Sequence, residues 1–492
     1  MRILAALLLT FPAISLAQQV GIAEYNLPLG TGGVFPGPSG ITAGPDGAMW
    51  FTEYWANNIC RLSPSGTSTE YPVPTANYRP SEITSGPDGA LWFTGAYGGI
   101  GRITTDGVIT QYPLPTNLGG IITGPDGALW FTEPSANQIG RITTTGVVTA
   151  YPLPANPEFP SGSYPSGITV GPDAALWFTE YAAGQIGRIT TAGQITEYPV
   201  SPAYGLSGIA AGPDGALWST GTDAQLIVRT TTAGKSIVYA LPNSLVYPGS
   251  ITVGPDLALW FTATNLGRIT TSGTITEYPA PPMADSIPGA LTRGPDRELW
   301  FTYGTNGIAV GEAVIANATL GVSPPNGYFD SSLAFIGSGF AANENVTMYT
   351  QSVGSAVLSS AIADSSGSFS ATAHAPQSAK GPRIFIAVGQ TSGKVGIANF
   401  SMAPRLVLAP NLGPAGSTVT VEGYGFDYPA GVELFWDNPR TLLGTGVANT
   451  YGTFHGGAAV TFTVPADAPA GSNGVFGRDN TGAIGLTFFT VE

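Results

Sequence analysis

Apolar residues in the first three-fifths of the chain occur in short runs separated by glycine, proline, threonine and aspartate, a pattern typical of β-strands joined by tight turns. Residues 120–154 show it in full, and four consecutive strands are predicted there, at Ile121–Thr123, Ala128–Thr132, Gln138–Thr143 and Val147–Leu153. The Gly-Pro-Asp-Gly between the first two strands predicts a β-turn, because proline presets φ at the first corner and glycine closes the turn.

This unit recurs seven times. Its Gly-Pro-Asp triplets begin at Gly44, Gly86, Gly124, Gly171, Gly212, Gly254 and Gly294, which are 38 to 47 residues apart. Such spacing is expected for one four-stranded blade of a β-propeller. Seven of the nine tryptophans fall on the same frame: Trp50, Trp92, Trp130, Trp177, Trp218, Trp260 and Trp300. A position filled alike in every repeat indicates packing between blades rather than a local site, so we predict an all-β chain with a seven-bladed propeller in residues 18–316.

The two ends of the repeat region predict how the ring closes. The seventh repeat lacks the outer strand that the sixth carries at Ile275–Pro281, whereas a matching strand, Ile22–Pro28, precedes the first repeat. A ring closed by a strand from the opposite end explains both observations and leaves no exposed sheet edge between first and last blades.

Beyond the propeller a second periodicity predicts two small β-sandwich modules, residues 317–403 and 404–492. The stretch Ile336–Phe340 is echoed by Glu422–Phe426, 86 residues later. The size and the turns of the two predicted modules resemble those of the immunoglobulin-like modules of bacterial exported proteins, and this resemblance implies a spacer or adhesive role.

Composition and the first residues of the chain restrict the classes of partner and the cellular compartment that we expect. The net charge of −14 makes nucleic-acid binding improbable. Residues 1–17 have the positive start, apolar stretch and small-x-small end of a secretory signal peptide, and no later stretch is long enough for a transmembrane segment. We therefore expect a secreted, periplasmic or cell-surface protein. Cys60 is the single cysteine, so no disulfide within the chain is possible.

The search for chemistry in the propeller finds no histidine. The two histidines of the chain, His374 and His455, both lie in the tail. A Ser-His-Asp arrangement and the usual histidine-containing zinc sites are thus excluded from the ring, and no phosphate-binding glycine loop occurs. We predict no metal site and no cofactor.

Two sets of loops vary between repeats, one after each Trp-Phe-Thr and one before each innermost strand. Propellers bind ligands at the channel mouth, on loops of this kind. If both sets share one face, they form a site for a small molecule, glycan or protein, with tyrosine rings beside carboxylates. The alternative is an ordinary acidic rim. The ligand-binding candidates are Glu53, Glu82, Glu133, Glu180, Tyr78, Tyr164, Tyr204, Tyr247 and Tyr303.

The repeat phrase Gly-Pro-Asp-Gly-Ala-Leu-Trp-Phe-Thr-Glu, with Gln-Ile-Gly-Arg-Ile-Thr-Thr and Ile-Thr-Glu-Tyr-Pro, closely resembles the virginiamycin B lyase (streptogramin lyase) family over residues 22–314. The resemblance implies a seven-bladed propeller. It also implies a carbon–oxygen lyase that opens a cyclic depsipeptide with a histidine base and Mg²⁺.

The family's histidines stand in a Pro-His-x-Ile context before late innermost strands, where this chain has Gly249 and Gly289. Earlier repeats carry serine at the corresponding place, which cannot act as a base near neutral pH. Two hypotheses follow. The first is a non-catalytic exported propeller that binds a ligand or partner. The alternative is a Mg²⁺-dependent lyase that uses a carboxylate, with Glu82 as a weak catalytic candidate, provided that its pKa is raised.

Overall fold

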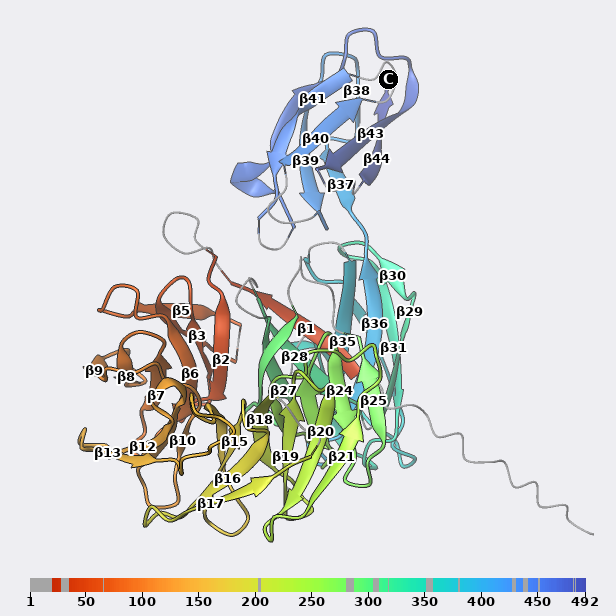
Figure 1. Ribbon diagram of the computed structural model, residues 1–492. Helices are drawn as coiled ribbons and strands as arrows, with labels where there is room; N and C mark the ends of the chain where they lie inside the picture. Colours follow the sequence, from red (N-terminus) through yellow and green to blue (C-terminus); the bar gives the residue numbers. More distant parts are fainter. Residues whose placement is uncertain are drawn as a thin grey trace, which may run out of the picture.

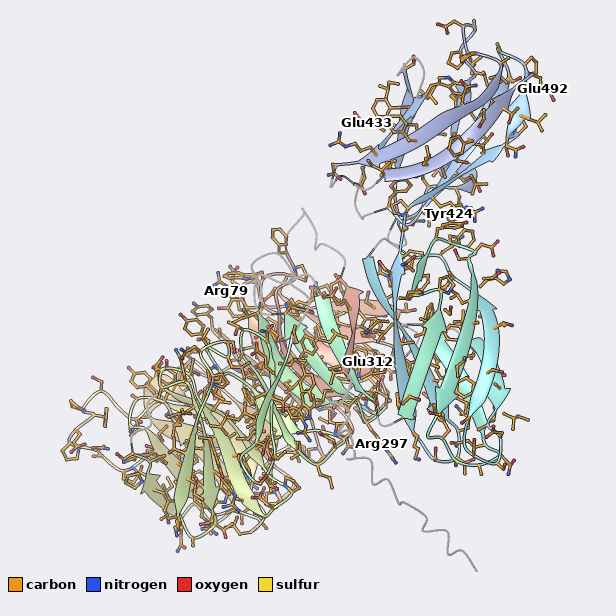
Figure 2. All side chains as sticks on the ribbon, turned by 90° about the vertical axis from the view of Figure 1, so that its right-hand side faces the viewer. Arg79, Arg297, Glu312, Tyr424, Glu433 and Glu492 are labelled. Atoms are coloured by element: carbon orange, nitrogen blue, oxygen red, sulfur yellow. The ribbon has the colours of Figure 1, made fainter. Side chains whose placement is uncertain are left out.

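The computed structural model describes residues 20–492 except 28–34, 65, 202–204, 280–286, 304–308, 317, 351–356, 379–380, 427–430, 437–440, 450–451, 481 and 483. The signal-peptide prediction and Tyr204 lie outside these residues. Seven four-stranded sheets form a ring, and two further β units follow it (Figure 1, Figure 2). The described residues contain two single-turn 3₁₀ helices, η1 (Pro134–Ala136) and η2 (Gly456–Ala458), and no helix long and apolar enough to span a membrane.

In blades 1 to 6 the strands run outward from the channel in sequence order, and the predicted seven-bladed propeller is confirmed. Blade 1 contains β2 (Pro38–Ala43), β3 (Met49–Glu53), β4 (Asn58–Leu62) and β5 (Ser68–Pro72), and blade 2 contains β6 (Pro80–Ser85), β7 (Leu91–Gly95), β8 (Gly99–Ile103) and β9 (Ile109–Tyr112). Blade 3 contains β10 (Ile121–Thr123), β11 (Leu129–Glu133), β12 (Gln138–Ile142) and β13 (Val148–Pro152), and blade 4 contains β14 (Pro165–Val170), β15 (Leu176–Glu180), β16 (Gln185–Ile189) and β17 (Ile195–Pro199). Blade 5 contains β18 (Leu206–Ala211), β19 (Ala216–Gly221), β20 (Leu226–Thr231) and β21 (Ser236–Ala240), and blade 6 contains β22 (Ile251–Val253), β23 (Leu259–Thr262), β24 (Leu266–Ile269) and β25 (Ile275–Tyr278).

Blade 7 is closed by the strand that begins the described chain. It consists of β26 (Pro288–Arg293), β27 (Leu299–Tyr303), β28 (Ala309–Ile315) and β1 (Val20–Asn26), and β1 pairs antiparallel with β28 along its whole length. The Tyr25 ring stacks on Trp300 with centroids 5.0 Å apart. The predicted closure by the opposite end of the repeat region is therefore confirmed, although Pro28, the predicted end of the strand, lies outside the described residues.

The repeated tryptophans pack between blades, as predicted. Trp130 is fully buried, stacks on Tyr151 of its own outer strand at 5.4 Å, and lies in one cluster with Phe178 of blade 4. In blades 2, 3, 4, 6 and 7 the phenylalanine that follows the tryptophan covers a glycine of the third strand, and a Cβ on Gly140, for example, would lie 2.1 Å from the Phe131 ring. Blade 1 has Cys60 in place of this glycine. Blade 5 has Ser219 and Val228 in place of this Phe–Gly pair, so that the smaller side chain on the second strand is compensated by a larger one at the paired position of the third strand.

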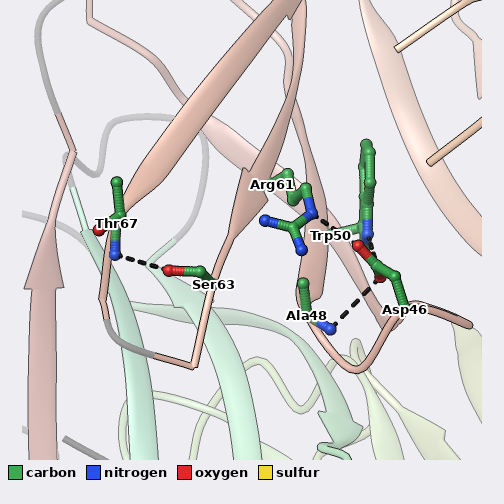
Figure 3. Close-up of polar contacts among 6 residues, drawn as sticks. All are labelled: Asp46, Ala48, Trp50, Arg61, Ser63 and Thr67. Carbon is green, nitrogen blue, oxygen red and sulfur yellow. Dashed lines mark hydrogen bonds and ion pairs between the residues drawn. The ribbon is translucent and has the colours of Figure 1, made fainter. Parts of the chain in front are cut away.

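The aspartate of Gly-Pro-Asp does more than form the turn that the sequence predicts. In blade 1, Asp46 Oδ1 accepts a hydrogen bond from the Trp50 indole at 3.0 Å, and Asp46 Oδ2 pairs with Arg61 Nε at 2.6 Å (Figure 3). Six blades repeat this arrangement, with ion pairs of 2.6–2.7 Å. The carboxylate thus joins the turn, the second strand and the third strand.

The threonine two residues after each repeated tryptophan connects neighbouring blades around the channel. Its hydroxyl donates to a carbonyl that precedes the innermost strand, or lies at its start, in the next blade: Thr52 to Ser81, Thr94 to Gly119, Thr132 to Ser166, Thr179 to Ser207, Thr220 to Gly249, Thr262 to Gly289 and Thr302 to Ser39. All seven donor–acceptor distances lie between 2.5 and 3.1 Å. The last bond joins blade 7 to blade 1, so the ring of hydrogen bonds is complete.

The first tail unit is one sheet that curves so that its end strands meet. It contains β29 (Ala318–Ser323), β30 (Asn326–Gly327), β31 (Ser332–Ser338), β32 (Asn345–Thr350), β33 (Val357–Ile362), β34 (Phe369–His374), β35 (Gly381–Gly389) and β36 (Val395–Met402). Strands β35 and β36 pack on the closing strand of the propeller, where Ile384 and Ile397 cover Ala23 and Val314. The first unit therefore buries the outer face of β1.

The second tail unit is a sandwich of two sheets around one core. One sheet contains β37 (Arg405–Ala409), β39 (Thr418–Tyr424) and β42 (Val460–Thr463), and the other contains β38 (Leu412–Gly413), β40 (Gly431–Trp436), β41 (Thr441–Val447), β43 (Gly471–Asp479) and β44 (Ile484–Val491). Tyr424 meets the first unit by stacking on Phe329 at 4.3 Å (Figure 2). The likeness to immunoglobulin-like modules and the boundaries 317–403 and 404–492 stay predictions.

Candidate functional site

The two variable loop sets lie on one face of the propeller, as the sequence analysis supposed. Backbone hydrogen bonds connect the loop after the second strand with the segment before the innermost strand of the same blade. Examples are Ala96 N–H to Arg79 O at 3.1 Å, Tyr181 N–H to Tyr164 O at 2.9 Å and Thr264 N–H to Val246 O at 3.0 Å. The Gly-Pro-Asp turns lie at the other end of the second strand. We call the face with the variable loops the channel face.

In five blades the residue four positions before the isoleucine of the innermost strand has a left-handed backbone. Glycine takes this conformation without strain at Gly37 (φ 62°) and Gly205 (φ 63°). In the other three blades the residue is bulky and precedes proline: Arg79 (φ 52°), Tyr164 (φ 55°) and Tyr247 (φ 57°). A non-glycine residue in this region is disfavoured by roughly 1–2 kcal/mol. Three large side chains are thus held in strained positions that glycine fills freely in sister blades.

Two of these strained side chains offer aromatic surface to solvent. The side chain of Tyr247 is 63% exposed and that of Tyr164 is 40% exposed. Tyr181 lies next to Tyr164, and its hydroxyl donates to Asp223 at 2.9 Å. The predicted candidates Tyr164 and Tyr247 therefore have the placement that a ligand platform needs.

Arg79 is the centre of an aromatic cluster that the sequence analysis did not select. Its guanidinium carbon lies 5.4 Å from the Tyr54 ring, 4.8 Å from Trp55 and 5.4 Å from Tyr97. Arg79 lies among the loops of the propeller (Figure 2). Trp55 and Tyr97 are 44% and 72% exposed. Phe35 is 58% exposed and precedes Pro36, whose carbonyl oxygen accepts a hydrogen bond from the Trp55 N–H. The sequence does contain a signal for this cluster, because Trp55 is the one propeller tryptophan outside the repeat frame.

Two tyrosine candidates need correction, because burial removes their rings from any ligand. Tyr78 fills the space left by Gly95 and Gly98, and its hydroxyl donates to Gly99 O at 2.8 Å. Tyr303 is also buried, and its hydroxyl donates to Glu24 at 2.7 Å. Burial raises the pKa of both hydroxyls. Both rings belong to the packing of the propeller.

Three glutamate candidates also lie inside rather than on the rim, because each ends a buried second strand and is directed between blades. Glu53 accepts a hydrogen bond from Asn58 at 3.1 Å, and burial together with the nearby Glu70 raises its pKa to about 7. Burial and the neighbouring Glu197 raise the pKa of Glu180 to about 8. Glu133 is buried as well and accepts a hydrogen bond from Thr116 at 2.6 Å. The expected rim of tyrosines beside carboxylates is therefore not present in that form.

Glu82 lies on the innermost strand β6. Its N–H donates to Thr94 Oγ1 at 3.1 Å, and burial raises the pKa of its carboxyl group. The sister position in blade 1 is Gly40, where a Cβ would approach the Glu82 Cα to 2.8 Å. The innermost strands of blades 1 and 2 thus pass very close to one another beside this carboxyl group.

Comparison with known proteins identifies close relatives of the propeller. The profile of the virginiamycin B lyase family matches residues 16–161 and 159–318. A curated virginiamycin B lyase from Saccharopolyspora erythraea is 48% identical over 99 residues, which are 20% of this chain and 32% of that protein. That match spans about a third of the relative's length.

Solved structures align over the whole propeller. A virginiamycin B lyase from Staphylococcus aureus is 38% identical and covers 60% of this chain and 99% of its own, with a TM-score of 0.55. A streptogramin B lyase is 37% identical over 60% of this chain and 98% of its own, also with a TM-score of 0.55. A catalytically inactive histidine-to-alanine variant of the Staphylococcus aureus enzyme, solved with quinupristin, aligns equally well at 37% identity, 60% and 99% coverage and a TM-score of 0.55.

Proposed function

Since the chain belongs to the virginiamycin B lyase family, we propose that it is a non-catalytic member, which binds a ligand or partner at the channel face of its propeller. The observation that carries the proposal is the strained, exposed pair Tyr164 and Tyr247. Backbone strain persists where the rest of the structure or a function maintains it, and glycine in sister blades shows that the fold itself does not require these side chains.

The absence of an imidazole supports binding without catalysis. Residues 18–316 contain no histidine, and glycine stands at positions 249 and 289, where the family resemblance places histidines. The histidine-to-alanine variant of the Staphylococcus aureus enzyme is described as catalytically inactive. That variant was solved with quinupristin, so cyclic depsipeptides are the first ligands to test, followed by glycans, for which tyrosine faces are also suited.

The proposal includes an extracytoplasmic location, secreted, periplasmic or at the cell surface. It rests on the signal-like pattern of residues 1–17 and on the two tail modules, which would act as spacer or attachment.

The test uses variants that separate binding from folding. Tyr164→Gly and Tyr247→Gly remove the ring and also relieve the left-handed strain. They should therefore stabilise the propeller while weakening ligand binding by about 1–3 kcal/mol each. Quinupristin and a glycan array are the probes, with and without Mg²⁺. The matched control is Leu257→Gly, which relieves the same kind of strain (φ 59°) in a Gly-Pro-Asp turn on the opposite face.

A folding defect cannot produce the expected combination of higher stability and weaker binding. Unchanged binding in both tyrosine variants, or ligand capture by a protein that consists of the tail alone, would place the site elsewhere and contradict the proposal.

A Mg²⁺-dependent carbon–oxygen lyase remains the second candidate, favoured by the raised pKa of Glu82, Glu53 and Glu180. A carboxyl group with a pKa near neutrality can act as a general base. Glu53 and Glu180 are fully buried, whereas Glu82 is partly exposed, which leaves Glu82 as the candidate to test. Chromatography of virginiamycin B incubated with the protein and Mg²⁺ should show no linear product. Turnover that Glu82→Gln abolishes would establish the lyase instead.

A further inference from the structure

Blade 7 differs from the other six in the group that faces its tryptophan. In blades 1 to 6 the third-strand residue opposite the tryptophan is an arginine, which pairs with the aspartate of Gly-Pro-Asp. In blade 7 the residue opposite Trp300 is Glu312, which is labelled in Figure 2. The turn aspartate, Asp296, is retained and still accepts a hydrogen bond from the Trp300 indole at 3.0 Å. Blade 7 thus carries a carboxyl group where the other six blades carry a guanidinium, beside the same kind of aspartate–tryptophan pair.

The pKa of the turn aspartate differs between blades with the arginine and blade 7, which lacks it. At Asp46, burial is outweighed by hydrogen bonds from Trp50 and Arg61, and the carboxyl pKa is lowered. Burial raises the pKa of Asp296. Glu312 is buried too, and it accepts a hydrogen bond from the Tyr25 hydroxyl at 2.8 Å. At the junction between blades 7 and 1, the Glu312 carboxyl group therefore stands where the other junctions carry a guanidinium.

The same junction is wider than the others. In five junctions the tyrosine of the outer strand presses on a glycine of the next blade, where an added Cβ would lie 2.1–2.5 Å from the ring. At the junction of blades 7 and 1 the corresponding pair is Tyr25 and Gly66, and the same distance is 3.6 Å. The missing arginine and the looser hairpin contact together leave space beside Trp300.

A cavity of about 230 Å³ lies at this junction, beside Asp296 and Trp300. Blade 7 contributes Pro295, Asp296 and Trp300, and blade 1 contributes Met49 and Leu62, with the Ser63–Pro64 turn at the edge. Its volume is smaller than the roughly 300–1,000 Å³ of pockets that enclose a drug-sized molecule. It suits a single group the size of a side chain, with an aromatic wall, an aliphatic wall and a carboxylate.

We propose that this cavity binds a guanidinium group on an aliphatic stem, such as an arginine side chain, in the place that the blade's own arginine takes elsewhere in the ring. The six complete blades show the binding mode, in which the guanidinium Nε bonds the aspartate while the cation lies about 6 Å from the indole centroid in four of them. Guanidinium pairs well with carboxylates and with aromatic faces, whereas a metal ion needs more ligands. Among the described residues no group of three histidine, cysteine or carboxylate side chains could hold a metal ion.

The site is independent of the proposed function, because it lies at the Gly-Pro-Asp end of the second strands, opposite the channel face. The test is calorimetric titration of the full chain with arginine amide, and with citrulline amide as the uncharged isostere. Arginine amide should bind and citrulline amide should bind at least tenfold more weakly. Asp296→Asn, which can still accept from the indole, should reduce arginine amide binding at least tenfold.

Two further variants make the result specific. Asp256→Asn removes the same carboxylate from blade 6, where Arg268 already fills the space, and should leave arginine amide binding unchanged. Glu312→Arg should abolish binding by supplying the missing side chain. Equal binding of the two amides, or undiminished binding in Asp296→Asn or Glu312→Arg, would overturn the proposal. Tighter binding of a Gly-Arg-Gly peptide than of arginine amide would identify the natural ligand as an arginine side chain of a protein. Weaker binding of the peptide would identify it as a free small molecule.

Discussion

The ring of threonine hydrogen bonds should make a measurable contribution to the free energy of unfolding at the junction between blades 7 and 1, which closes the propeller. Thr302 is fully buried, and its hydroxyl accepts from Ala290 N–H at 2.9 Å while it donates to Ser39 O at 2.8 Å. Thr302→Val keeps the shape of the side chain but leaves both backbone groups without this partner. Each orphaned group costs about 1–3 kcal/mol when it is fully buried. Because Ala290 and Ser39 are only partly buried, water can restore part of this loss, and we expect a total of about 1–3 kcal/mol.

The assay is urea unfolding at 25 °C followed by tryptophan fluorescence, which reports on the propeller because only Trp436 of the nine tryptophans lies in the tail. Thr179→Val is the matched variant at an interior junction, with the same two bonds at 2.9 and 2.6 Å. Thr302→Ser, which keeps the hydroxyl, should lose less than Thr302→Val. If Thr302→Val unfolds like the unmodified protein while Thr179→Val is destabilised, the ring does not close in solution as described.

Three other outcomes are expected. Leu257→Gly should raise the free energy of unfolding by about 1 kcal/mol, because the exposed Leu257 has φ 59° where four sister turns have glycine; no gain in the urea midpoint would contradict the strain argument. The Glu180 carboxyl group has a folded-state pKa of about 8, above its unfolded value, so stability should fall as pH rises from about 4.5 to 8; Glu180→Gln should remove about 2–4 kcal/mol of that fall between pH 5 and pH 8, and parallel pH profiles would refute it. Deleting Val20–Asn26 should lower stability by more than the ~3–5 kcal/mol of one large buried side chain, as measured by thermal circular dichroism, and a melt like that of the intact chain would exclude closure by β1.

The fold was predictable because the repeat is strict. Turn residues, strand lengths and the tryptophan frame recur in each blade, so that one reading of Gly120–Pro154 applies seven times, and the orphan strand before Gly44 could be matched to the gap after Trp300. The packing of the first tail unit on β1 was not predictable, because the covering residues Ile384 and Ile397 look like any alternating strand residues until their contacts are known.

The candidate site was predicted only in part. The loops and the tyrosines Tyr164 and Tyr247 could be selected from their irregularity, but sequence does not show which side of a strand end faces solvent. Glu53 and Glu180 end buried strands, and their direction between the blades depends on the pleat and on the neighbouring blade. The missing arginine of blade 7 was visible as Glu312 in the sequence, yet its significance required the ion pairs of the other six blades.

Closure by β1 also determines the order in which the chain can fold. The hydrogen bond from Tyr25 to Glu312 joins residues 287 positions apart, whereas the strands within blades 1 to 6 pair with close neighbours in sequence. A chain made from its N-terminus at 5–20 residues per second must wait roughly 15–60 s before the partner strand β28 exists. During that time β1 is a free strand that can pair with other chains. Formation of the ring should thus be a late and slow step, and the first tail unit, which covers β1, can add its contacts only after it.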